Sequence, residues 1–153
     1  MSPQPHADAD AAGADFERLL AAFFDAVSFA PGKAPAYGNI RALFIDAGLL
    51  IKNSAATPEI STVDQFIMPR QAMFDAGQLT RFHESELSGL TEVFGNVGHR
   101  FSVYAKSGTQ NGVSFDVQGM ISTQFVRTPA GWRISAMAWD DERPGLSIAE
   151  RNA

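Results

Sequence analysis

The sequence changes character near residue 79, and this change constrains the fold more than any other feature. Before it, apolar residues recur at helical spacing, as in Phe16, Leu20, Phe23 and Val27. After it, segments rich in Val, Ile, Phe, Thr and Tyr alternate with Gly-containing turns, which is the pattern of strands joined by hairpins. Helices followed by an antiparallel meander predict the α+β class, with the N-terminal helices packed on one face of a curved antiparallel sheet.

The N-terminal half is expected to hold three helices and one short strand. The helices are predicted from residue 15, from residue 39 and from residue 61, the last opened by a capping box at 61–64 and kinked by Pro69. The short strand is the apolar run 49–51. The four long strands are predicted at 79–94, 99–107, 113–127 and 132–142.

Length, charge and cysteine content exclude several classes of protein. The 153 residues fit one domain, expected at 15–143 between a disordered tail at 1–14 and a C-terminal tail at 144–153. A net charge of −5 argues against a nucleic-acid binder. The absence of cysteine excludes disulfides and thiol catalysis. No apolar run spans a membrane and no secretory signal is evident, so we expect a cytoplasmic protein.

Alternation along each strand divides the predicted sheet into an inner and an outer face. In the third long strand, the side chains at odd positions from Phe115 to Phe125 are expected to face the helices. In the last strand the same rule turns Asp140 inward together with Ile134. In the second strand the apolar set, which includes Phe101, is expected inward, whereas the register of the first long strand stays open.

The outer face of this predicted sheet carries large side chains that a monomer seldom leaves together in water. Aromatic and Met enrichment with few charges is typical of the core of an interface. We therefore expect a homodimer that packs sheet face against sheet face; scattered surface apolar residues are the alternative. The predicted contact residues are Tyr104, Met120, Met137 and Trp139.

Three segments carry a resemblance to a known family. They are residues 16–25, residues 43–47 and the ending Gly-Trp-Arg-Ile-Ser-Ala-Met-Ala-Trp-Asp at 131–140. Together with the order of elements, they resemble the nuclear-transport-factor-2-like superfamily of cone-shaped α+β barrels. That superfamily includes ketosteroid isomerases, SnoaL-like polyketide cyclases, scytalone dehydratase and domains without a known activity. The resemblance covers residues 15–143 and implies a pocket between the concave sheet and the helices.

The catalytic groups of ketosteroid isomerase are absent from this chain. By alignment, its general-base carboxylate falls at Lys52, its first-helix tyrosine at Phe23 or Phe24, and its strand carboxylic acid at Thr123. Proton transfer beside a carbonyl by that enzyme's groups is therefore not expected here.

Two residues are predicted as catalytic acid or base. Asp140, if turned into an apolar cavity, would have a raised pKa; the alternative is a solvated strand end paired with Arg143 or Lys52. His83 can shuttle protons if it faces inward, and Glu84 or Glu86 takes that role in the opposite register. A surface histidine is the plainer alternative for His83.

The remaining candidates would line the pocket. Lys52 is expected at its rim, where an amine can bind an anionic ligand or simply reach solvent, and Tyr37 lies in a loop that can cover the mouth. The predicted ligand-binding residues are Phe24, Tyr37, Lys52, Phe74, Phe101, Phe115 and Thr123. The histidines lack metal-ligand spacing, so neither a metal nor a cofactor is expected.

Two functions are consistent with these features. The first is a pocket protein that binds a small apolar molecule, with cofactor-free acid/base isomerisation, dehydration or cyclisation if it is an enzyme. The second is a noncatalytic dimerisation or accessory domain whose cone is filled by Phe side chains. An open cavity of several hundred Å³ with convergent polar groups would distinguish the first from the second.

Overall fold

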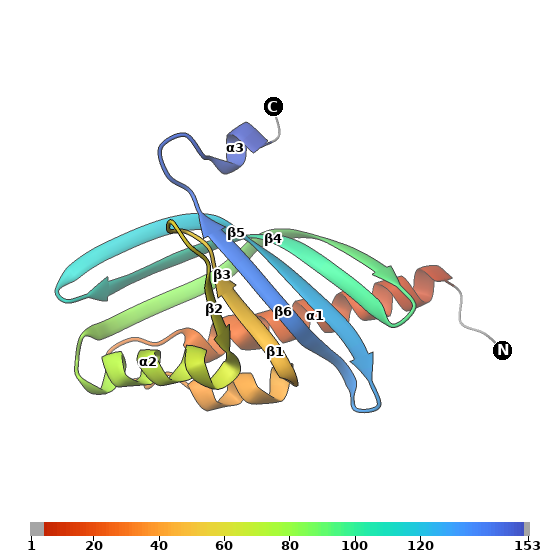
Figure 1. Ribbon diagram of the computed structural model, residues 1–153, viewed down its shortest axis with the longest axis horizontal. Helices are drawn as coiled ribbons and strands as arrows, with labels where there is room; N and C mark the ends of the chain where they lie inside the picture. Colours follow the sequence, from red (N-terminus) through yellow and green to blue (C-terminus); the bar gives the residue numbers. More distant parts are fainter. Residues whose placement is uncertain (1–4, 152–153) are drawn as a thin grey trace.

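Four long antiparallel strands form most of a six-stranded sheet in the computed structural model, which describes residues 5–151. The other two strands are shorter. One runs parallel to the last long strand, and the other pairs with this parallel strand at the edge of the sheet. The order across the sheet is β2-β1-β6-β5-β4-β3 (Figure 1). The strands are β1 (Phe44–Lys52), β2 (Glu59–Thr62), β3 (Leu79–Phe94), β4 (Val97–Gln110), β5 (Val113–Thr128) and β6 (Gly131–Asp141).

The predicted α+β class and the four long strands are confirmed. The sheet is mixed rather than purely antiparallel, because β1 runs parallel to β6. Of β1, only residues 49–51 near its C-terminal end were predicted as a strand, because residues 44–48 were assigned to the preceding helix. β2 was not predicted; it has four residues, too few for periodicity to be informative.

The helices lie mainly on one side of the sheet. Figure 1 shows α1 (Pro5–Val27), the 3₁₀ helix η1 (Tyr37–Leu43) and α2 (Val63–Asp75) beneath the curved sheet, and α3 (Ile148–Arg151) beyond its other face. Among residues 5–151, none of these helices combines the length and the apolar character needed to cross a bilayer.

Helix α1 begins ten residues before its predicted start. The segment assigned to a disordered tail is rich in alanine, the strongest helix former, and Ala12 within it is only 1% exposed. Residues 1–4 of that predicted tail and residues 152–153 of the C-terminal one lie outside the described residues. The rest of the C-terminal segment turns back at Arg143 and Leu146, and the Ile148 N–H donates to the Glu142 carboxylate at 3.0 Å.

The capping box of α2 lies one residue later than predicted. The Thr62 hydroxyl accepts from the Gln65 N–H at 3.2 Å, and the Gln65 side chain accepts from the Thr62 N–H at 3.0 Å. Thr62 is the last residue of β2, where it pairs with Leu49, and the helix begins directly after it at Val63. Pro69 lies inside α2, as expected, and the helix continues to Asp75.

The inner face of β5 is the predicted one. Ile121, Thr123 and Phe125 are buried, whereas Ser122 and Gln124 between them are exposed. Phe125 stacks on Phe16 of α1, with ring centroids 3.9 Å apart. This contact ties α1 to the middle of the sheet.

The inner face of β6 follows the prediction only as far as Ile134. The pairing with β5 shifts between Phe125 and Gln124, which leaves Ser135 as an extra residue. A β-bulge of this kind reverses the faces of all the residues beyond it. Met137 therefore packs into the core at 0% exposure, and the prediction that Asp140 faces inward is wrong.

The predicted facing of β4 is also wrong. Its polar set faces the helices, with Arg100 and Ser102 buried, while Phe101 is 41% exposed. The reason is a network within the sheet: Arg100 contacts both carboxylate oxygens of Glu86 at 2.7 and 2.8 Å, and Ser102 donates to Glu86 at 2.6 Å. Buried charges that are paired in this way are tolerated on an inner face.

The same network sets the ionisation of Glu86. Burial opposes its charge, but the hydrogen bonds from Arg100 and Ser102 and the guanidinium charge outweigh burial and hold the pKa of Glu86 below its ordinary value. Glu86 is therefore a structural anion. The Arg100 guanidinium also donates to the Thr91 hydroxyl at 2.7 Å and lies 3.6 Å from the Glu17 carboxylate.

These placements change the predicted dimer surface. Tyr104 and Met137 are buried at 0% exposure, and Trp139 packs against the core. Of the four predicted contact residues, only Met120 lies on the outer face, opposite Asp140 and Val103 in its neighbouring strands. The homodimer itself stays a prediction, but the three inward residues are removed from its predicted contacts.

One inward hydroxyl offers a test of this packing. Thr123 is fully buried, and its Oγ1 has no hydrogen-bond partner among the described residues. We expect Thr123→Val to keep or raise the free energy of unfolding, by up to about 1 kcal/mol, because no hydrogen bond is lost. Thr91→Val should lower it by about 1 kcal/mol, because the Arg100 donor loses its acceptor. Urea unfolding of both variants measures the difference, and a larger loss in Thr123→Val would contradict the assignment.

Candidate functional site

A cavity of about 410 Å³ lies between the inner face of the sheet and the helices. Its walls come from every long element, so no single segment of the sequence defines it. Most of the lining is apolar or aromatic, and the polar groups converge from β1, β2, η1, α2, β3 and β4. The lining residues are Phe23, Val27, Tyr37, Lys52, Glu59, Phe66, Pro69, Arg70, Met73, Leu79, Phe82, Glu84, Lys106, Gln110, Phe115, Ile121 and Trp139.

Glu84 is the carboxylate at the centre of this site. Its backbone is fixed by Ser28 at the end of α1, whose hydroxyl accepts from the Glu84 N–H at 3.0 Å. The side chain turns into the cavity from β3, opposite Lys106 of β4. Within residues 5–151, the carboxyl group of Glu84 takes part in no hydrogen bond or ion pair.

The surroundings of Glu84 favour its neutral form. Burial raises the pKa of Glu84 to about 7, and the charge of Asp141 adds to this, while Lys106 and Arg70 act in the opposite direction. Burial is the largest cause because it removes the water that would solvate the carboxylate. Near neutral pH, this group therefore exists in both protonation states, as a general acid or base requires.

Lys106 is held by a second carboxylate. Its Nζ lies 3.0 Å from Oδ1 of Asp141, and both side chains are largely covered. The hydroxyl of Tyr104 donates to the same carboxylate, and burial followed by that hydrogen bond raises the pKa of Tyr104, so the phenol stays protonated. The Lys106 ammonium is thereby neutralised by Asp141 at the edge of the cavity.

Arg70 enters the cavity from α2. Its guanidinium lies over the ring of Phe66, 3.6 Å from the centroid, and donates to the Phe66 carbonyl at 3.0 Å. In the part of the chain that the structure describes, it forms no ion pair with a carboxylate. Burial lowers the pKa of Arg70, while the charges of Glu59, Tyr37 and Glu84 act in the opposite direction.

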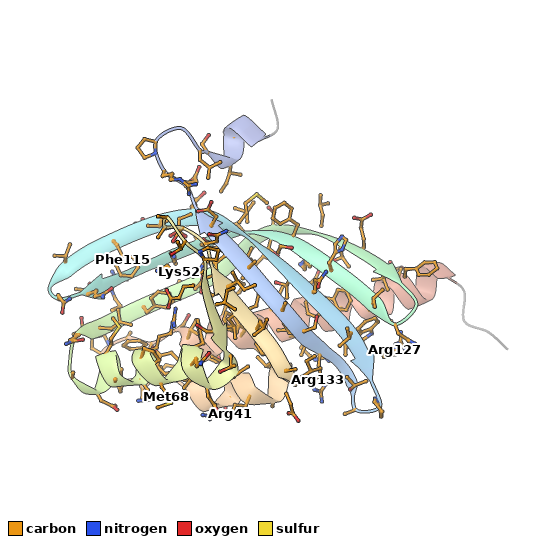
Figure 2. The ribbon with its side chains drawn as sticks, viewed as in Figure 1. Arg41, Lys52, Met68, Phe115, Arg127 and Arg133 are labelled. Atoms are coloured by element: carbon orange, nitrogen blue, oxygen red, sulfur yellow. The ribbon has the colours of Figure 1, made fainter. Side chains whose placement is uncertain are left out.

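Three of the predicted ligand-binding residues line the cavity: Tyr37, Lys52 and Phe115. Figure 2 labels Lys52 at the end of β1 and Phe115 on β5. Tyr37 is 2% exposed and forms part of the wall rather than the loop lid that the sequence suggested. Burial raises the pKa of Tyr37, so its phenol keeps its proton.

The other four predicted ligand-binding residues lie elsewhere. Phe24 is buried in the core under α1, and Phe74 packs against Phe29 with centroids 5.1 Å apart. Phe101 lies on the outer face, because β4 has the opposite register. Thr123 faces inward, but it is enclosed by the core and does not reach the cavity.

Neither predicted catalytic residue reaches the cavity. The bulge at Ser135 turns Asp140 to the outer face, where it pairs with Arg143 at 2.5 Å. This pairing is the alternative that the sequence analysis gave for Asp140. His83 is exposed beside α1, because β3 takes the register that turns its neighbours Glu84 and Glu86 inward.

The sequence analysis missed Arg70 and Asp141 and held Glu84 only as an alternative. Arg70 follows a proline in a helix and carried no visible signal. Asp141 becomes an inward residue only through the bulge at Ser135. Glu84 was detectable from the alternation of β3, but nothing in the sequence selected one register over the other.

Metal ligands are not gathered at the cavity. Among residues 5–151, no group of three His, Asp or Glu side chains lies close enough together to hold a metal ion. The ionisable groups of the lining are therefore two carboxyls, Glu59 and Glu84, one phenol, Tyr37, and three cations, set among mainly apolar side chains.

Comparison with solved structures shows what this architecture is. A nuclear transport factor 2 (NTF2-like) superfamily protein from Salmonella enterica serovar Typhimurium matches with a TM-score of 0.69 at 13% identity, over 88% of this chain and 94% of that one. This chain has the nuclear-transport-factor-2-like fold. The fold predicted from the resemblance is thereby confirmed.

Two more proteins of the nuclear-transport-factor-2-like fold match at similar levels. A candidate dehydratase of the NTF2-like family from Streptomyces avermitilis matches with a TM-score of 0.65 at 13% identity, over 92% of this chain and 99% of that one. An NTF2-like protein with a cystatin-like fold from Novosphingobium aromaticivorans matches with a TM-score of 0.64 at 15% identity, over 90% of this chain and 84% of that one. No family model and no curated protein sequence matches the chain.

The raised pKa of Glu84 predicts how stability depends on pH. The folded-state value of about 7 lies above the ordinary 4.5, so the folded state binds the extra proton between these values. The stabilisation is full below about 4.5 and is lost as pH rises through about 7, by a few kcal/mol at most. Urea unfolding across this range should show the decline in wild type.

Glu84→Gln should remove that part of the pH dependence, because glutamine cannot ionise. Glu59→Gln is the matched control, since it removes an exposed carboxylate from the lining of the same cavity and should keep the wild-type profile. Identical profiles for wild type and Glu84→Gln would contradict the enclosure of the Glu84 carboxyl.

Proposed function

We propose that this protein binds a compact, largely apolar molecule in the cavity and moves a proton on it without a cofactor, with Glu84 as the acid or base. One observation carries the proposal: a carboxyl group without a hydrogen-bond partner among the described residues faces a cavity of about 410 Å³ whose lining is mainly apolar. Its pKa of about 7 matches the value that proton transfer near neutral pH requires.

The cavity supplies what such a reaction needs around the base. Ionised Glu84 takes a proton from carbon, and the negative charge that develops on a substrate oxygen is stabilised by the neighbouring cation Arg70 and by the phenol of Tyr37. Return of the proton at another carbon gives isomerisation. Transfer of that proton from Glu84 to a departing hydroxyl group instead releases water, which is dehydration, and leaves Glu84 ionised again. Aromatic walls limit the entry of water, which strengthens these electrostatic interactions.

Two further points support this class of reaction. A structural neighbour from Streptomyces avermitilis is described as a candidate dehydratase, which is one of the reactions that a positioned carboxyl can catalyse. The cavity volume is within the usual range for small-molecule sites, which disfavours the alternative of an accessory domain with a filled core.

A minimal substrate tests Glu84 as a base. 5-Nitrobenzisoxazole needs only removal of its ring C–H proton, after which the N–O bond breaks and a coloured cyanophenolate forms. We expect turnover that rises with pH around a midpoint near 7, and a loss of about 100-fold or more in Glu84→Gln. Absorbance of the phenolate measures the rate of turnover at each pH, for wild type and for Glu84→Gln.

The control is Asp116→Asn, which removes an exposed carboxylate from the outer face of β5 and should leave the rate unchanged. Equal rates for wild type and Glu84→Gln, with both proteins folded by circular dichroism, would refute the assignment of Glu84 as the base.

A further inference from the structure

The charges of the cavity do not balance, and the imbalance points to a ligand. Three cations line it, and one of them, Lys106, is neutralised by Asp141 at 3.0 Å. The carboxyl of Glu84 is protonated for a large part of the time near neutral pH. Lys52 and Arg70 remain against one exposed carboxylate of the lining, Glu59. Within residues 5–151, neither cation forms an ion pair with it or with another carboxylate.

Arg70 is the more informative of the two cations. Its side chain is partly buried, and its position is fixed by the Phe66 ring at 3.6 Å and by the hydrogen bond to the Phe66 carbonyl at 3.0 Å. A guanidinium has five N–H donors, and these two contacts occupy only part of them. The charges of Glu59 and Glu84 favour this cation, but neither carboxylate comes within ion-pair distance, so the cost of burying the charge is only partly offset. An anion from outside the chain would remove that cost.

Lys52 extends the positive side of the cavity. It is the last residue of β1 and pairs in register with Glu59 of β2, without an ion pair between their side chains. Lys52 also pairs in register with Trp139 of β6, whose ring lies 6.1 Å from that of Phe66, the ring under Arg70. The two cations therefore flank one pair of aromatic rings. Phe82 and Phe115 form a second pair in the lining, with 6.1 Å between centroids.

We infer that the natural ligand is a compact aromatic or apolar carboxylate whose anionic group is bound by the guanidinium of Arg70, with Lys52 adding charge at the same side. This inference rests on the proposed function and names the class of molecule on which that site acts. The planar fork of arginine fits a carboxylate with two parallel hydrogen bonds. The apolar part of the ligand then lies among the aromatic rings, within reach of the wall that carries Glu84.

Matched acids and amides test the inference directly. The probes are benzoate, phenylacetate and 3-phenylpropanoate, each compared with its neutral primary amide by isothermal titration calorimetry at pH 6, below the titration of Glu84. Wild type should bind at least one acid about tenfold or more tightly than the amide of the same shape. Arg70→Met keeps an apolar side chain against Phe66 and should reduce that ratio to within about twofold, with amide binding unchanged.

Two further variants complete the design. Arg70→Lys should restore part of the preference for the acid, because charge remains while the fork is lost. Arg41→Met is the control, since Arg41 is an exposed arginine paired with Asp64 at 2.8 Å and should keep the full preference. Figure 2 labels Arg41 on the lower edge of the helical layer.

Equal binding of acid and amide by wild type, or an undiminished preference in Arg70→Met, would overturn this inference and leave the proposed function intact. If wild type binds none of the probes but still turns over 5-nitrobenzisoxazole, the inference is likewise overturned and the proposed function is left intact. A clear acid preference without any dependence of turnover on Glu84 would instead overturn the proposed function alone. The wild-type comparison needs no variant, so a misfolded Arg70→Met does not prevent a decision.

Discussion

The stacking of Phe16 on Phe125 is the contact on which the rest of the arrangement depends. Their ring centroids are 3.9 Å apart, and the Trp132 ring meets Phe16 edge-on at 4.9 Å. The helix can approach this closely because Gly98 of β4 has no side chain: a Cβ there would lie 2.5 Å from the Phe16 ring. With α1 fixed at this point, its C-terminal end reaches β3, where Phe29 and Phe82 exchange backbone hydrogen bonds.

That docking divides the inner face of the sheet into two regions. Under α1, polar side chains are satisfied within the protein, as Arg100, Glu86 and Ser102 show. Farther along the same strands, the wall opposite Glu84 is α2, and a cavity remains between them. Two glutamates of one strand therefore have opposite properties. Hydrogen bonds from Arg100 and Ser102 outweigh burial and lower the pKa of Glu86, whereas burial without such donors raises that of Glu84.

The bulge at Ser135 decides which carboxylate of the β6 terminus joins the site. Without it, alternation would place Asp140 beside the cavity and Asp141 in solvent. With it, Asp141 faces inward, where it neutralises Lys106 and accepts from Tyr104, and Asp140 pairs with Arg143 outside. A single extra residue thus places Asp141 rather than Asp140 at the edge of the cavity.

The sequence by itself determined the class of fold, the four long strands and the inner face of β5, because hydrophobic periodicity reports burial directly wherever one face is uniformly apolar. It also identified Tyr37, Lys52 and Phe115, which line the cavity. Tertiary structure alone decided the facing of β3 and β4, where several inward residues are charged or polar, and of the end of β6, where the bulge at Ser135 reverses the alternation. Long-range pairing of Arg100 with Glu86, and of Lys106 with Asp141, makes this inward polar arrangement stable, and no local pattern records such partners.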